Sequence, residues 1–355
     1  MTIVLTLVAM FSLLLMRVPV AFALGGLGLA MLLLGGFSPL MAPQAVLSTL
    51  DGFILLAVPL FLLMSNILLR AGVGNDLFAA VSAWVGHWPG GLAVATILSC
   101  GVFAAISGSS VATAATIGTV AIPEMINRGY NKKFVYGLLA AGGTLGILIP
   151  PSIPMIIYGF VTEESVISLF LAGIGPGIAL LVFFIIFSMI YARMGGQELE
   201  PKKGWDERRR ATIKALPSVI LAVLIISGIY SGAFTPTEAA AIGFAAALII
   251  TGPIMRVLTW DALKKAIFDS MATTVAIILI IAGAKIFGKA ITLYRIPQDI
   301  SMMITQGIDT ELGFILIVTA VLLVMGLGFE ALAMVLIMSP VVLPAALALG
   351  FGPSW

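Results

Sequence analysis

Long runs of apolar residues, separated by short polar segments, follow one another along almost the whole chain. A run of about 20 apolar residues can cross the hydrocarbon core of a membrane as an α-helix. The pattern therefore predicts an all-α polytopic membrane protein, whose first apolar run is a retained helix rather than a cleaved signal peptide. Two further apolar stretches lie at 91–126 and 312–348. The predicted spans are 2–16, 18–36, 52–70, 134–159, 165–191, 214–231, 236–254 and 270–290.

Composition agrees with this class. Of the 355 residues, 61% are hydrophobic and 10% are charged, and the mean hydropathy is +1.19. Soluble domains carry about 25% charged residues. The single cysteine, Cys100, and the single histidine, His87, exclude a disulfide framework and disfavour a Cys/His metal site. The net charge of +2 says nothing about partners, and the Lys and Arg clusters of such a chain report orientation, not binding of a nucleic acid.

The distribution of basic residues predicts the orientation of the spans. Loops rich in Lys and Arg are cytoplasmic by the positive-inside rule, and loops with acids but no Lys or Arg are outside. The expected cytoplasmic group is Arg17, Arg70, 128–133, 193–214 and 256–265, and the expected outer group is 37–51, 161–165 and 231–238. The loop 193–214 is amphipathic and is expected to lie on anionic lipid, with Trp205 as an anchor.

The segment 91–126 lies between two cytoplasmic segments, so it must enter and leave the membrane on the same side. Its centre is the small polar turn Ser107-Gly-Ser-Ser110. A re-entrant helical hairpin is therefore predicted there, because irregular backbone is tolerated at membrane depth only where protein or water covers it.

An internal repeat is suggested by an offset of 221 residues, which pairs Pro123 with Pro344 and places Glu330 opposite Ser109. An odd number of crossings separates the two copies, so the second copy is expected to be inverted. The second copy ends at Trp355, where its counterpart of 134–159 would begin. We therefore expect a C-terminal truncation that removes two or three spans of about 20 residues.

The broken helix is the strongest functional signal. Pro150, Pro151 and Pro154 interrupt an apolar run and lack the N–H groups that a helix interior requires. The carbonyls of Gly146 and Ile147 lose their donors, and unpaired carbonyls in hydrocarbon cost several kcal/mol unless something binds them. Hard cations prefer oxygen ligands, so a site for a small cation is predicted against the turn at 107–110. The alternative is that the prolines only kink a helix.

Three motifs show a resemblance to a known family. The chain reads SGSSVATAATIG from Ser107, GTLGILIPPSIP from Gly143 and GAFTPTEAAA from Gly232. These motifs, with VPLFLLM from Val58 and Ile296-Pro-Gln, resemble the large membrane subunit of tripartite ATP-independent periplasmic (TRAP) transporters. The likeness extends over the whole chain.

The resemblance implies sodium-coupled uptake of an organic acid anion, such as a C4-dicarboxylate or sialic acid, across the bacterial cytoplasmic (inner) membrane. It implies an elevator fold, and as partners a separate small four-helix membrane subunit, a periplasmic substrate-binding protein and membrane lipid. Sodium ions are the expected coupling ions, with no other cofactor and no transition metal. Four consecutive parts are expected: scaffold helices 1–70, a first transport repeat 71–160, central scaffold helices 161–265 and an incomplete second repeat 266–355.

The main sodium site follows from the resemblance, and reasoning from the backbone independently selects only Gly146 within it. Thr113 and Thr116, with Thr119, share one helix face and line the substrate path or only pack their helix. Glu330 is the only acid in 312–348, where it is either a second sodium ligand at a hairpin tip or a Glu at the water-filled mouth of the hairpin. The sodium ligands that the resemblance implies are Ser107, Ser109, Gly146, Ile149 and Pro151, and Gly108 and Glu330 are added to them. The expected substrate ligands are Ser110, Thr113, Thr116, Pro150, Ser152 and Arg295.

Several alternatives stay open. Arg295 either pairs with a substrate carboxylate or lies at the membrane interface, and Glu238 is expected to be part of a helix cap. Lys285 and Lys289 lie inside an apolar span without an assigned role. A stand-alone sodium–carboxylate symporter is the alternative function. An enzyme is disfavoured because motifs for a nucleophile–base pair or a metal cluster are missing from the sequence, and a channel would need no delivery partner.

Overall fold

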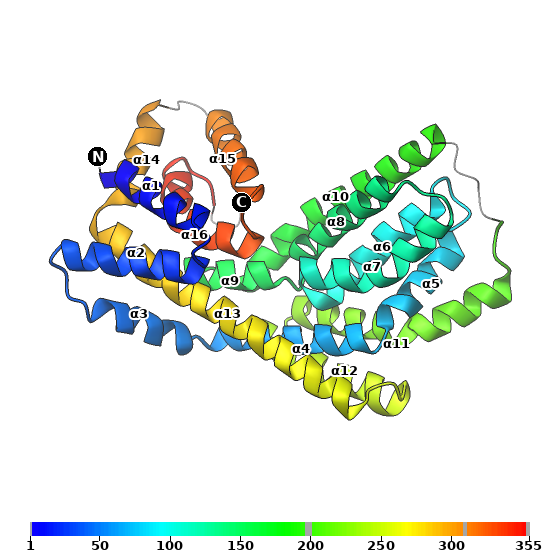
Figure 1. The fold of residues 1–355 in the computed structure, drawn as a ribbon. Coiled ribbons are helices and arrows are strands. Elements are labelled where there is room, and N and C mark those ends of the chain that lie inside the picture. Colours follow the sequence, from blue (N-terminus) through cyan, green and yellow to red (C-terminus); the bar gives the residue numbers. More distant parts are fainter. Residues whose placement is uncertain (1, 196–200, 308–310, 353–355) are drawn as a thin grey trace. The chain divides into compact units, whose positions relative to one another are not determined.

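The computed structural model describes residues 2–195, 201–307 and 311–352, and these residues contain helices and no strand. The chain forms two compact units (Figure 1). We call Met1–Phe53, Ile157–Ser165 and Ala272–Trp355 the terminal unit, and Ile54–Ile156 and Val166–Met271 the central unit. Two of the four boundaries between the units fall within the helices α9 and α13. The four consecutive parts expected from the sequence stay a prediction.

The central unit contains both features that the sequence predicted for a site. Helices α6 and α7 pack against each other and are joined by the short turn at Gly108 and Ser109, which confirms a helical hairpin. Its re-entrant course in a membrane stays a prediction. The next two helices, α8 and α9, are separated at 149–152 and bent by 42°, which confirms the broken helix. The elements of the central unit are η1 (Phe53–Leu56), α4 (Ala57–Arg70), α5 (Val73–Val85), α6 (Gly91–Ser107), α7 (Ser110–Asn127), α8 (Lys132–Leu148), the start of α9 (Ile153–Thr162), α10 (Val166–Met194), α11 (Trp205–Tyr230), α12 (Pro236–Ile249) and the π-helix Ile250–Ile254.

The terminal unit joins the two ends of the chain. Glycines allow α2 to cross α13 closely: a methyl group at Gly283 would lie 2.3 Å from the carbonyl oxygen of Ala21. The segment 37–51, expected to be a loop, contains a helix, so that expectation was wrong. The elements are α1 (Thr2–Leu15), α2 (Val20–Leu34), α3 (Met41–Leu50), most of α13 (Trp260–Leu293), α14 (Ile296–Gly307), α15 (Glu311–Gly326) and α16 (Ala331–Ala348).

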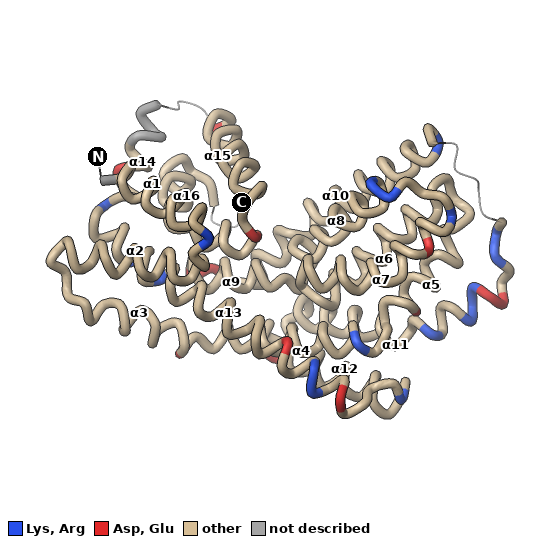
Figure 2. The backbone as a smooth tube through the Cα atoms, viewed as in Figure 1, with Lys and Arg blue, Asp and Glu red and all other residues tan. Residues whose placement is uncertain are grey.

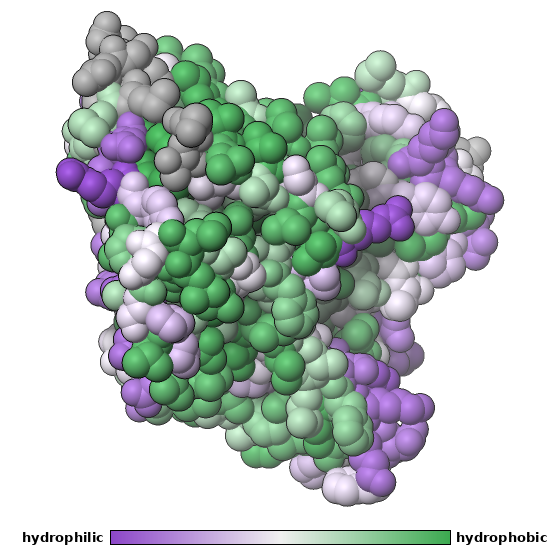
Figure 3. All heavy atoms as spheres, turned by 60° about the vertical axis from the view of Figure 1, so that its left-hand side comes forward, coloured by the Kyte–Doolittle hydropathy of each residue, from purple (hydrophilic) through white to green (hydrophobic). Residues whose placement is uncertain are grey.

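Six described helices are long and apolar enough to cross a membrane, and the broken pair α8–α9 makes a possible seventh. The helices predicted at 2–16 and 18–36 are present, but they are short apolar helices below that length. Figure 3 shows apolar side chains over much of the displayed face. Large apolar side chains such as Leu34 and Phe22 are exposed. These findings define an all-α polytopic membrane protein.

The 221-residue offset is reproduced in the secondary structure. Helix α7 and helix α16 start and end at positions exactly one offset apart, and each is followed by a glycine with a positive φ, Gly129 at 79° and Gly350 at 88°. Both helices close with the same backbone bond, in which an N–H beyond the glycine returns to a carbonyl of the last turn. These bonds run from Tyr130 N to Met125 O (3.1 Å) and from Phe351 N to Ala346 O (3.0 Å).

The basic segment 193–214 is less loop-like than expected. Helix α10 extends to Met194 and α11 begins at Trp205, so the basic residues of 205–214 are helical. Figure 2 shows the Lys and Arg residues gathered along the start of α11. Arg208 fixes this helix to α5: its Nε donates to the carbonyl of Ala83 (3.1 Å), and its guanidinium lies 5.2 Å from the ring centroid of Trp84.

Thr235 begins α12 with a capping box, as the sequence indicated for Glu238. The Glu238 N–H donates to the Thr235 hydroxyl (3.3 Å), and the Thr235 N–H donates to the Glu238 carboxylate (2.8 Å). Removing an N-cap hydroxyl costs about 1 kcal/mol, so Thr235→Ala is expected to lower the thermal unfolding midpoint of the detergent-solubilised protein. Glu238→Gln is the control, because an amide also closes a capping box. An unchanged midpoint for Thr235→Ala would contradict a role for the cap.

Candidate ion-binding site

The tip of the α6–α7 hairpin (residues 107–110) lies directly against the break of the α8–α9 helix (residues 149–152). The N–H of Ile153 donates to the carbonyl of Gly108 at 3.0 Å. A methyl group at Gly108 would lie 2.6 Å from the Pro151 carbonyl oxygen, and one at Gly146 would lie 2.6 Å from the Ser109 carbonyl oxygen. Glycine is required at both positions because the two backbones approach this closely.

Hydroxyl and carbonyl oxygens gather inside the tip. The hydroxyls of Ser107 and Thr113 lie 2.9 Å apart, and the Thr113 hydroxyl donates to the Ser109 carbonyl at 2.8 Å. Both side chains are fully buried. The Ser109 hydroxyl accepts from the N–H of Ala112 (3.4 Å) and so caps α7. Buried polar atoms are thus arranged as a compact set of oxygens, the donor type that hard cations prefer.

The break leaves one of the two predicted carbonyls without a local donor. The Ile147 carbonyl accepts a hydrogen bond from the Ser152 hydroxyl at 2.5 Å, which replaces the N–H that Pro151 lacks. The Gly146 carbonyl would be paired by residue 150 in a continuous helix, but Pro150 has no N–H, and the Ile149 N–H donates to Leu145 instead (2.8 Å). Gly146 therefore remains the better candidate ligand from the break.

Four helix ends adjoin where the tip meets the break. Helices α6 and α8 end there, and α7 and α9 begin there. The C-terminal end of a helix carries partial negative charge and favours cations, whereas the N-terminal end favours anions. The same small region can therefore bind a cation at one pair of ends and a carboxylate at the other, without a buried charged side chain.

The other residues of the central unit that were predicted to bind sodium or substrate differ in their burial and in the helices that they contact. Thr113 and Thr116 are both buried, and Thr116 packs against Gly74 of α5, where an added methyl would lie 2.5 Å from its Cγ2. The Ile149 side chain packs toward α10, near Gly177. A role of Ile149 as an ion ligand would therefore use its backbone. Ser110 is partly exposed and is the first residue of α7.

Glu330 and Arg295 belong to the terminal unit, not to the central unit that holds the tip and the break. Glu330 is exposed and occupies the N-cap position of α16, one offset from the N-cap Ser109 of α7. Arg295 is exposed, precedes α14 and has a φ of 59°. Their assignment to an ion or substrate site stays a prediction.

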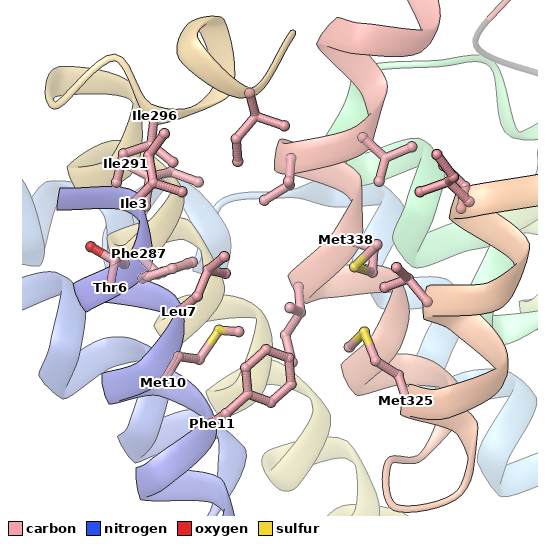
Figure 4. A pocket seen from close by; sticks show the side chains of 17 residues that line it. Ile3, Thr6, Leu7, Met10, Phe11, Phe287, Ile291, Ile296, Met325 and Met338 are labelled. Carbon is pink, nitrogen blue, oxygen red and sulfur yellow. The ribbon is translucent and has the colours of Figure 1, made fainter. Parts of the chain in front are cut away.

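A cavity of about 490 Å³ lies within the terminal unit, between α1, α13, α14, α15 and α16 (Figure 4). Its lining is apolar except for Thr6, and it includes the side chains of Met10, Phe11, Met325 and Met338. Such a lining offers neither charge nor a set of oxygens, so it is not a site for a sodium ion or a carboxylate.

Sequence reasoning missed two contributions to the site. Ser152 was assigned to substrate, yet its hydroxyl satisfies the Ile147 carbonyl, and the Ile153 N–H joins the break to the tip. The signal for Ser152 was available, since a serine directly after two prolines is placed to donate to a carbonyl that they leave unpaired. The tip–break bond had no sequence signal because it connects residues 45 positions apart.

A hairpin tip packed against a broken membrane helix is an arrangement of secondary transporters. Residues 7–355 match the family described as "Tripartite ATP-independent periplasmic transporter, DctM component", and the chain belongs to this family. The resemblance seen in the sequence is thereby confirmed, and the chain is a transporter permease subunit rather than an enzyme.

Named relatives differ in what their names say they transport. The C4-dicarboxylate TRAP transporter large permease protein DctM of Pseudomonas aeruginosa is 40% identical over 305 residues, which cover 86% of this chain and 71% of that protein. The sialic acid TRAP transporter large permease protein SiaM of Vibrio cholerae is 33% identical over 336 residues (94% and 79%). The ectoine TRAP transporter large permease protein TeaC of Halomonas elongata is 36% identical over 299 residues (84% and 70%).

Proposed function

We propose that this chain uses a sodium gradient to take up an organic acid anion across the bacterial inner membrane. In this proposal a periplasmic binding protein delivers the acid, and a small membrane subunit completes the tripartite complex. The family description and the relatives named for C4-dicarboxylate and sialic acid support the class of function and of substrate. The observation that carries the sodium site is the contact of the Gly108 carbonyl with the Ile153 N–H, which brings oxygen-rich backbone from two breaks together.

In this mechanism the cation binds first to the backbone and hydroxyl oxygens around Ser107, Ser109, Gly146, Ile149 and Pro151. The bound cation replaces the hydrogen bonds that these oxygens now make with one another and fixes the tip against the break. The substrate carboxylate then meets the starts of α7 and α9, near Ser110 and Ser152, where the helix dipoles favour an anion. Coupling follows because the cation orders the backbone that the anion needs.

Ser109→Ala tests this site. Uptake is measured in proteoliposomes that contain the chain, the small subunit and the loaded binding protein, at varied sodium concentration. Loss of a hydroxyl ligand is expected to raise the half-saturating sodium concentration by about tenfold, which corresponds to about 1.4 kcal/mol. Ser227→Ala is the matched control, because its hydroxyl bonds only to carbonyls of its own helix, α11.

Unchanged sodium dependence in Ser109→Ala would remove that residue from the ion site. Wild-type uptake that proceeds equally well without a sodium gradient would overturn sodium coupling itself. Uptake of free acid without any binding protein would favour the stand-alone symporter instead.

A further inference from the structure

Two lysines on α13 have no part in the site described above. Lys285 and Lys289 are one helical turn apart, so their side chains leave the same face of the helix. Like charges at this spacing repel each other and destabilise a helix by a few tenths of a kcal/mol. Ionisable residues in an apolar membrane helix are costly and mark functional positions.

The internal repeat shows that the architecture does not require these lysines. The 221-residue offset places α4 opposite the end of α13, where Lys285 corresponds to Met64 and Lys289 to Leu68. Met64 and Leu68 are completely buried in the central unit. The first copy therefore uses core residues where the second copy carries two positive charges.

The two lysines differ in their surroundings within the terminal unit. The Nζ atom of Lys285 lies 4.8 Å from the ring centroid of Phe160 at the end of α9, and Glu163 interacts with it electrostatically. Lys285 is half-buried, whereas Lys289 is exposed. Among the described residues, Lys289 has no ion-pair partner. Lys285 thus has a counter-charge within the terminal unit, whereas the exposed Lys289 ammonium can accept an anion from outside.

The predicted orientation places this pair at the outer boundary of the membrane. Lys285 lies 20 residues beyond Lys265, the last residue of the basic segment 256–265, on the same helix α13. At about 1.5 Å per residue this is a rise of about 30 Å, which equals the thickness of the hydrocarbon core. Glu163 lies in the acidic segment 161–165, which the same rule places outside. Lysine and arginine are concentrated on the cytoplasmic side of membrane proteins, so two lysines at the outer boundary need another explanation.

We infer that Lys285 and Lys289 form an anion-accepting site at the outer end of α13, which receives a carboxylate of the acid before it is transported. Glu163 is the counter-charge of Lys285 while no acid is bound, and the incoming carboxylate takes over this role. A small anion fits better than an acidic protein surface, because the half-buried Lys285 ammonium is flanked by the Phe160 ring. This inference rests on the proposed function.

The test compares uptake as a function of the concentration of loaded binding protein, at saturating sodium, in the complete reconstituted complex. Lys285→Ala and Lys289→Ala are each expected to raise KM by about tenfold with Vmax nearly unchanged, because binding alone is weakened. Lys289→Arg is expected to keep the wild-type KM. Glu163→Gln is expected to lower KM by about threefold, since it removes a competing carboxylate. The effect at Lys289 should shrink as ionic strength rises.

Lys264→Ala is the matched control, because it removes the same charge from the other end of α13, where Lys264 lies 5.7 Å from the Trp260 ring centroid. The sign of the Glu163→Gln effect separates the two roles: a purely structural Lys285–Glu163 tie predicts a higher KM or a lower unfolding midpoint. Such a result, or a wild-type KM in Lys289→Ala, overturns the inference. Failure of the proposed function is distinguished because it appears in the wild type, as uptake without sodium dependence.

Discussion

Gly146→Ala is expected to reduce sodium-driven uptake by at least about tenfold while the chain stays folded, because functional sites tolerate displacements of only about 0.5 Å. The added methyl would lie 2.6 Å from the oxygen and 2.7 Å from the carbon of the Ser109 carbonyl, and 2.9 Å from the Ser110 N. All three atoms are backbone, so no side-chain rotation relieves the clash. The hairpin tip must move away from the break, and the oxygens proposed to bind sodium separate.

Gly137→Ala on the same helix is the control for this result. An added methyl at Gly137 meets nothing within 4 Å, so it tests the effect of alanine in α8 without the clash. Uptake by the reconstituted complex and the sodium concentration for half-maximal uptake are the measurements. Wild-type values for Gly146→Ala would show that the tip and the break need not touch during transport, and would contradict the proposed site.

Gly108→Ala is expected to destabilise the protein more than any other single methyl addition at the tip. Its φ of 62° lies in the left-handed region, which costs an L-residue roughly 1–2 kcal/mol. The methyl would also lie 2.6 Å from the Pro151 carbonyl oxygen, and overpacking costs typically 1–3 kcal/mol. The two costs act together, because the backbone can relieve neither without breaking the Gly108–Ile153 bond.

Thermal unfolding of the detergent-solubilised protein measures this effect. Gly232→Ala is the matched control, since Gly232 has a similar φ of 74° but nothing within 4 Å of an added methyl. The difference between the two variants isolates the contact with the break from backbone strain. Equal losses in the two variants would show that this contact contributes nothing to stability.

The hairpin and the broken helix were both predictable because their signals are local. The polar turn at 107–110 interrupts an apolar run, and the prolines at 150 and 151 remove two backbone N–H donors from the helix. Helix α3 and the first turns of α11 lie where the sequence analysis expects loops. Charge and the length of the polar segment predict loops there, whereas helix propensity favours helices. Both segments carry enough apolar or helix-forming residues to continue as helix.

The repeat was weak as a sequence alignment and became clear from its helix ends. Few identities relate the two copies, but glycines at 129 and 350 close α7 and α16 with the same cap. A cap of this kind requires a positive φ, so glycine persists there while the surrounding side chains diverge. The exchange of Met64 and Leu68 for Lys285 and Lys289 is visible only after this register is fixed.

The sequence by itself determined the class of protein, its helices near membrane length, the hairpin, the break and the family. These depend on composition, periodicity and missing N–H groups, which are properties of neighbouring residues. Only the tertiary structure decided that the Ile153 N–H reaches Gly108 and that Lys285 lies beside Phe160. Those pairings depend on how helices pack in three dimensions, and local sequence does not encode which distant backbone fills the space beside a glycine.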